Sequence, residues 1–211
     1  LLLGIPTRDA NETKRRGFDA FNSIAVIGTD SGLYHKRRLV PFGEYVPLES
    51  VLRGLIAFFD LPMSSFSSGP AAQAPLTVRG LRVAPSICYE IVYPDLVGSG
   101  AADAELLLTV SNDTWFGASI GPLQHLQMAR MRALETARPL IRATNNGISA
   151  LIDARGGITV RGGQFTQEII RGEVQPTSGL TPFARWGSWW ALLLAVLPLV
   201  AAQLVRRRAP Q

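Results

Sequence analysis

Short apolar segments, separated by polar or glycine-containing turns, recur along most of the chain. Several are rich in β-branched residues and are bounded by turn-forming residues, a pattern typical of β-strands. Strands are expected at residues 1–5, 21–28, 33–36, 77–84, 105–110, 140–144 and 148–152. The pairs 21–28 with 33–36, and the two halves of 77–84 around Gly80, are each expected to form a hairpin.

Helices are expected between some of these strands. The longest covers about residues 122–138, with a proline in its first turn, where the missing N–H costs nothing, and Pro139 after its end. Shorter helices are expected at residues 48–59 and 93–98. Because strands alternate with helices and hairpins, the pattern predicts an α/β fold with a mixed or mainly antiparallel sheet.

The segment from Trp186 to Val205 contains no charged residue. A helix of about 20 residues is ~30 Å long, which is the thickness of a bilayer core. Tryptophans at one end and three arginines at the other fit the interfacial belt and the positive-inside rule. We therefore expect a transmembrane helix at 186–205, a basic cytoplasmic tail at 206–211, and the rest of the chain outside the cytoplasmic membrane. A buried core helix is the weaker alternative.

Composition adds limits on function. The chain has 211 residues and a formal charge of +5, and its basic residues fall in short clusters rather than on one face with interleaved aromatics. Nucleic-acid binding is therefore not expected. No glycine-rich phosphate loop or ligand cluster is visible, so neither a cofactor nor a metal is expected. The first residues, 1–5, resemble the middle of a strand more than a signal peptide, and we expect the sequence to be the C-terminal part of a longer protein.

Cys88 is the only cysteine and follows an apolar strand. A lone thiol serves packing or reactivity, and on this fact alone packing is the more common use. A reactive thiol needs a base or a nearby cation, and Glu90 and Lys36 are the candidates. His35 is expected to point to the other face of its strand and His125 to be solvated or held by packing, so a Cys–His pair is not favoured.

Four blocks of sequence surround these candidates. They are YHKRRLVPFGEYVP at 34–47, ICYE at 87–90, SNDTWFG at 111–117, and residues 124–147, which end in RATNNG. Together with the apolar C-terminal segment, they resemble the apolipoprotein N-acyltransferases, the membrane-bound branch of the nitrilase (carbon–nitrogen hydrolase) superfamily. One block alone would be a weak signal, whereas four in matching order over about residues 1–205 are a specific one.

This resemblance implies a nitrilase-like α-β-β-α sandwich over residues 1–178, incomplete at its N-terminus, and a Glu–Lys–Cys triad. Cys88 would take an acyl chain from a membrane phospholipid as a thioester. The α-amino group of a diacylglyceryl-cysteine on an apolipoprotein would then attack the thioester and form an amide, a two-step covalent path. The implied location is the bacterial inner membrane, with the catalytic domain on the periplasmic side.

The resemblance also implies roles for neighbouring residues. Lys36 would stabilise the thiolate and the tetrahedral oxyanion by its charge, while Glu44 and Glu90 would position Lys36 and the thiol. Tyr89 and Trp115 would line the acyl or lipid pocket. Without the resemblance, turn capping explains the two acids, and aromatic packing explains Tyr89 and Trp115 equally well.

The general base is where the chain departs from the family pattern. The family's base glutamate lies upstream of the lysine block in a Trp-Pro-Glu-type motif, whereas the only glutamate before Lys36 is Glu12, in a polar turn. We assign no role to Glu12 and expect this chain alone to be inactive, with the base and further membrane helices encoded upstream. Two other functions stay open: a nitrilase-type amidase with water as acceptor, and an inactive truncated domain that binds lipid or lipoprotein.

Overall fold

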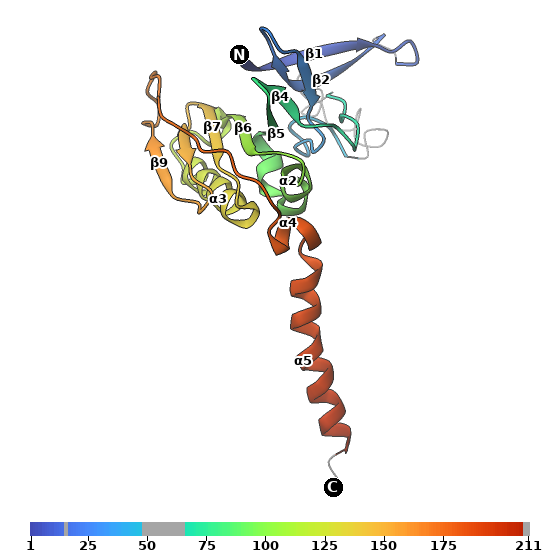
Figure 1. Cartoon of the computed structure of the whole chain (residues 1–211). Coiled ribbons are helices and arrows are strands. Elements are labelled where there is room, and N and C mark those ends of the chain that lie inside the picture. The colour runs from blue at the N-terminus through green and yellow to red at the C-terminus, as the bar shows by residue number, and fades with distance from the viewer. Residues whose placement is uncertain (15–16, 48–65, 209–211) are drawn as a thin grey trace.

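The computed structural model of the chain describes residues 1–14, 17–47 and 66–208 (Figure 1). The helix expected at 48–59 lies outside these residues. The strands are β1 (Leu2–Ala10), β2 (Phe18–Val26), β3 (Gly32–His35), β4 (Leu76–Val78), β5 (Leu81–Ile87), β6 (Leu106–Asn112), β7 (Leu140–Asn145), β8 (Ala150–Ile152) and β9 (Ile158–Arg161). The helices are η2 (Cys88–Val92), α2 (Pro94–Ala101), η3 (Asp113–Phe116), α3 (Gly121–Thr136), α4 (Pro182–Trp186) and α5 (Trp189–Arg208), where η marks a 3-10 helix.

These strands form two sheets, with orders β1-β2-β3 and β4-β5-β6-β7-β8-β9. The smaller sheet is antiparallel, and the larger one has a parallel centre of β5, β6 and β7 flanked by antiparallel pairs. The expected mixed sheet and both expected hairpins are confirmed. The strand expected at 1–5 was too short, because β1 continues to Ala10. Its ladder with β2 extends to the pair Ala10↔Phe18, and the Arg8 guanidinium lies 4.6 Å from the centre of the Phe18 ring.

Alternate residues of the central strands face two separate cores. Val83 and Leu106 pack with Ile24 of β2, which joins the two sheets face to face. Ala84 and Leu107 belong to the second core, where α2 and α3 cover the other face of the larger sheet. The described residues therefore contain three layers, helix, sheet and sheet, of the expected α-β-β-α sandwich.

Strand β1 forms the outer edge of the smaller sheet, and among the described residues no further strand pairs with it. Leu1, Leu3 and Ile5, at or just before its start, are exposed. Apolar side chains therefore lie beside an open strand edge.

Helix α5 extends away from the body of the molecule (Figure 1). The segment before it is bonded to the body, because Thr181 Oγ1 donates to the Glu135 carbonyl (2.6 Å) and the backbone N of Ser188 donates to Asp95 Oδ1 (3.1 Å). In the described part of the chain, no helix has both the length and the apolar character needed to cross a membrane. The transmembrane segment expected at 186–205 is thus not confirmed.

Candidate active site

Cys88 stands where β5 ends and η2 begins, at the carboxyl end of a parallel strand. Its φ is +50°, a left-handed conformation that costs a non-glycine residue about 1–3 kcal/mol. The residue is half-buried. One residue earlier, the N–H of Ile87 donates to Glu90 Oε2 (2.8 Å). The chain thus makes a sharp, strained strand-to-helix turn with the cysteine at its apex.

Lys36 directly follows β3 and is 1% exposed. Its Nζ lies 2.8 Å from both carboxylate oxygens of Glu44. Glu44 also accepts hydrogen bonds from Asn22 Nδ2 (2.5 Å) and from the backbone N of Val40 (2.8 Å). A buried ammonium without a partner is costly, and Glu44 is the ion-pair partner of Lys36 at this position.

Glu90 is fully buried and joins β3 to the turn that carries Cys88. Besides the Ile87 N–H, its carboxylate accepts hydrogen bonds from the Tyr34 hydroxyl and from the backbone N–H groups of Arg37 (2.6 Å) and Arg38 (3.2 Å). Burial raises the pKa of Glu90, although the backbone donors oppose this shift. Glu90 therefore connects the segment around Lys36 to the turn that carries Cys88, and it does so from a position outside the cavity.

A second buried cluster lies on the other side of Cys88. Nε2 of His125, in α3, lies 3.1 Å from the carbonyl oxygen of Cys88, and its Nδ1 lies 3.0 Å from Oδ1 of Asp113. Asp113 also accepts from Ser111 Oγ (2.6 Å) and from Nη2 of Arg142 (2.7 Å). Burial opposes ionisation of Asp113, but the hydrogen bond from His125, the charge of Arg142 and the hydrogen bond from Ser111 together lower its pKa. Asp113 is therefore a carboxylate.

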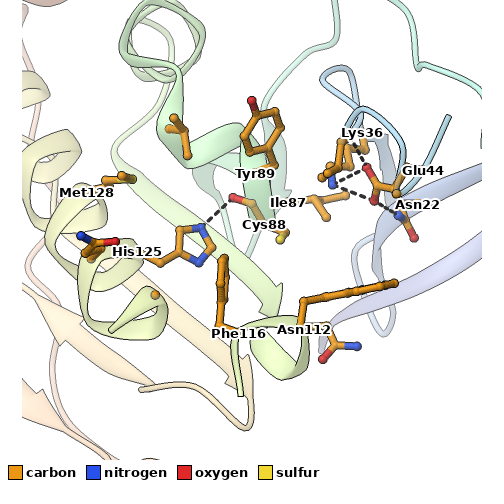
Figure 2. Close-up of a pocket in the computed structure, with 16 residues that line it drawn as sticks. Asn22, Lys36, Glu44, Ile87, Cys88, Tyr89, Asn112, Phe116, His125 and Met128 are labelled. Carbon is orange, nitrogen blue, oxygen red and sulfur yellow. Dashed lines mark hydrogen bonds and ion pairs between the residues drawn. The ribbon is translucent and has the colours of Figure 1, made fainter. Parts of the chain in front are cut away.

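Between these two clusters lies a cavity of about 590 Å³ with mainly apolar walls. Figure 2 shows Cys88 between His125 on one side and the Lys36–Glu44 pair on the other. Five predicted site residues line the cavity: Cys88, Lys36, Glu44, Tyr89 and Trp115. Glu90 lies behind its wall. Within the described ranges, no group of three or more His, Cys, Asp or Glu side chains is placed to hold a metal ion.

Of the two settings expected for His125, solvated or held by packing, the structure shows the buried one, because the residue is 4% exposed, and it also lines the cavity. Its position carried a signal, since Ala129 and Ala133 follow on the same buried stripe of α3. The sequence pattern around Asp113 and Arg142 gave no such indication of burial. Their contacts connect β7, η3 and α3, which are far apart in the sequence. By contrast, His35 lies outside the cavity lining, 2.8 Å from Ser23 Oγ.

Comparison with known proteins defines the class to which this site belongs. The family model for the carbon-nitrogen hydrolases matches residues 1–182, and the chain belongs to this family. Two solved structures share the fold: a carbon-nitrogen hydrolase from Helicobacter pylori G27 (TM-score 0.61, 16% identity, 82% of this chain and 61% of that chain) and Nit3 of Saccharomyces cerevisiae (TM-score 0.55, 18% identity, 77% and 55%).

More similar relatives are named apolipoprotein N-acyltransferase. The chain is 58% identical to the one from Azotobacter vinelandii over 209 residues, covering 99% of this chain and 40% of the relative. It is 54% identical to the one from Pseudomonas aeruginosa strain PAO1 over 211 residues, covering 100% and 41%. The chain therefore spans about two fifths of the length of these curated relatives.

Proposed function

We propose that the chain forms the nucleophile-bearing part of an apolipoprotein N-acyltransferase, with Cys88 as the acyl-carrying residue. The observation that carries the proposal is the placement of Cys88 on a strained turn beside a largely apolar cavity, with the Lys36–Glu44 ion pair across it (Figure 2). An apolar cavity suits a fatty acyl chain. The names of the relatives supply the substrate class, a lipoprotein that accepts an acyl group.

The proposed reaction has two steps. First, the Cys88 sulfur attacks the ester carbonyl of a phospholipid, the C–O bond breaks, and the lysophospholipid oxygen leaves with the thiol proton. A thioester remains on the protein. Second, the α-amino group of a diacylglyceryl-cysteine attacks the thioester carbonyl, the C–S bond breaks, and the proton lost by the amine returns to the sulfur. Lys36 stabilises the oxyanion of both tetrahedral intermediates.

The proton in the first step needs a general base. Among the cavity-lining residues that the structure describes, Glu44 is the only carboxylate, and its oxygens already accept from Lys36, Asn22 and Val40. Its lone pairs are therefore committed. This supports a base other than Glu44, and we propose that an isolated chain, without the family's upstream base glutamate, does not turn over.

We also propose that α5 associates with a bilayer, with the body on the periplasmic side of the bacterial inner membrane. The support is chemical: Leu193, Leu197 and Leu199 of this helix are at least 60% exposed, and Trp189 and Trp190 stand at its start, as in interfacial belts. Photocrosslinking in vesicles that contain the complete protein tests this: a photoreactive residue at Leu197 should label phospholipid, whereas one at Ile169, which is 83% exposed on the body, should not. No lipid label at Leu197 would contradict the proposal.

The proposed chemistry is tested in the complete protein with a phospholipid labelled in its acyl chain and a diacylglyceryl-cysteine peptide. Wild type is expected to carry a hydroxylamine-sensitive label and to form the N-acyl peptide. Cys88→Ser is expected to lose peptide formation, whereas the matched control Ser86→Ala, two residues earlier on β5, retains it. N-acyl peptide formed at the wild-type rate by Cys88→Ser would overturn the nucleophile.

An amidase is the runner-up, and the same assay separates it. With water as the acyl acceptor, such an enzyme would hydrolyse the thioester, release the label as free fatty acid, and make no N-acyl peptide. A domain that only binds lipid shows neither product and no label on Cys88.

A further inference from the structure

We propose that His125 is a positioning residue for Cys88, which holds the cysteine carbonyl so that the strained turn keeps the thiol in the cavity. The catalytic consequence rests on the proposed function, whereas the effect on the thiol itself does not. The observation is the contact between His125 Nε2 and the Cys88 carbonyl oxygen (3.1 Å), drawn as a dashed line in Figure 2.

The direction of this hydrogen bond follows from its partners. A carbonyl oxygen only accepts, so Nε2 carries the proton and donates it. At the other end of the ring, Nδ1 lies 3.0 Å from Oδ1 of Asp113 and 3.2 Å from Nη2 of Arg142. With the proton on Nε2, a neutral ring accepts from Arg142 at Nδ1, and a doubly protonated ring donates there to Asp113. The imidazole is therefore held at both nitrogens, in a buried site where a hydrogen bond is stronger than in water. The ring cannot turn without losing one of these bonds.

Asp113 is itself fixed from two sides. Ser111 and Arg142, from the neighbouring parallel strands β6 and β7, donate to its two carboxylate oxygens. Arg142 is anchored by a hydrogen bond from its Nε to the carbonyl of Ile148 (3.2 Å). Contacts thus run from β7 through Asp113 and His125 to Cys88, the residue that follows β5. A shift of β5, β6 or β7 relative to the others would therefore displace the backbone of Cys88.

The turn needs such support because a cysteine at φ +50° lies outside the conformations that this residue prefers. On its other side, the turn is held by the hydrogen bond from the Ile87 N–H to Glu90. Loss of His125 leaves the Cys88 carbonyl without the ring that now donates to it. The turn then relaxes toward ordinary φ values, and the thiol moves away from the Lys36 side of the cavity. A displacement of about 1 Å at a reacting atom costs up to ~10²-fold in rate.

The test uses the complete protein and three substitutions. His125→Leu removes both ring hydrogen bonds, and His125→Gln keeps an amide N–H that can donate to the carbonyl. Thr136→Val is the matched control: it is also buried in α3 and bonded there, to the Arg132 carbonyl (2.7 Å), but is not a cavity residue. The first readout is the rate of Cys88 alkylation by iodoacetamide without any acyl donor. The second is kcat and KM of acyl transfer.

His125→Leu is expected to slow alkylation and kcat by about 10²-fold with little change in KM for the acyl donor. His125→Gln is expected to regain most of the loss, and Thr136→Val to match wild type. A folded His125→Leu protein, with the melting temperature of Thr136→Val and wild-type alkylation, would overturn the inference. Equal loss in the Leu and Gln variants would also overturn it, because the donated bond would then be irrelevant.

These readouts separate the two proposals. Alkylation that depends on His125 in a protein that makes no N-acyl peptide keeps the inference and rejects the acyltransferase. Peptide formation with alkylation independent of His125 does the reverse.

Discussion

The hydroxyl of Tyr34 lies 3.0 Å from each carboxylate oxygen of Glu90. Tyr34 belongs to β3 and Glu90 to η2, so this contact ties the smaller sheet to the turn that carries Cys88. Lys36 lies two residues after Tyr34. A buried contact that involves neither Lys36 nor Cys88 therefore links the element before Lys36 to the turn that carries Cys88.

Glu90 is expected to give the protein a pH-dependent stability. Because burial raises its pKa above the ordinary value of 4.5, the folded protein holds this proton more tightly than the unfolded chain does. The resulting stabilisation is complete below pH 4.5 and is lost as the pH rises through the raised pKa. Glu90→Gln cannot ionise and lacks this loss, so its stability deficit relative to wild type should narrow as the pH rises. Urea unfolding followed by tryptophan fluorescence measures it, and a deficit that stays constant from pH 4.5 to neutrality would contradict the assignment.

The ion pair between Lys36 and Glu44 is expected to behave as a unit. Lys36→Met removes the cation from a carboxylate that is 15% exposed, and breaking a buried pair in this way costs about 3–5 kcal/mol. The double variant Lys36→Met/Glu44→Leu should lose less than the sum of the two single variants, because neither charge is left unpaired. The measurement is a double-mutant cycle: the free energies of unfolding of wild type, the two single variants and the double variant. Additive losses would show that the two side chains do not stabilise each other.

Gly147 is expected to tolerate no side chain. A Cβ at this position would overlap the carboxylate of Asp113, which is already bonded on both oxygens. Gly147→Ala should therefore destabilise the protein by about 1–3 kcal/mol and slow Cys88 alkylation. In the control Gly100→Ala, the atom nearest to the new Cβ is the Cβ of Ala84, at 3.6 Å. Since Gly100 lies in α2, this change should be neutral or stabilising by up to about 1 kcal/mol. Thermal unfolding of the two variants is the measurement, and equal melting temperatures would contradict the overlap.

Trp115 is expected to act on substrate binding and not on stability. It is 71% exposed yet lines the cavity, so Trp115→Ala should change the unfolding free energy by no more than about 0.5 kcal/mol. Loss of its apolar contact should raise KM for the acyl donor by about tenfold, which corresponds to about 1.4 kcal/mol. Ile169→Ala, a change at a residue that is 83% exposed and outside the cavity lining, is the control. An unchanged KM in Trp115→Ala would remove this residue from the acyl site.

The predictable parts of the fold were those with a local signal. Apolar segments located β2, β3, β5, β6 and β7, and the prolines at 122 and 139 bracketed α3 (Gly121–Thr136). Residues 6–10 of β1 escaped prediction because they start with a proline and include the charged Arg8 and Asp9, so only the ladder to β2 makes them a strand. The periodicity of one segment carries no information about a strand elsewhere in the chain, such as β2, that pairs with it.

The residues of the candidate site also fall into two groups, those within a local sequence motif and those placed only by long-range contacts. Lys36, Glu44 and Cys88 stand in compact sequence blocks and were predicted as site residues from them, and the fold brings all three to one cavity. The buried cluster of His125 and Arg142 was not predicted. Both side chains are held by Asp113, which lies more than ten residues from either in the sequence. Only the parallel order β5-β6-β7 makes these residues neighbours.

The open edge of β1 has a practical consequence for anyone who prepares this chain by itself. An unpaired strand flanked by exposed Leu1, Leu3 and Ile5 is a template on which another copy can add a strand. Self-association of the isolated chain should therefore begin at this edge, grow with concentration, and be suppressed by a charge such as Leu3→Lys.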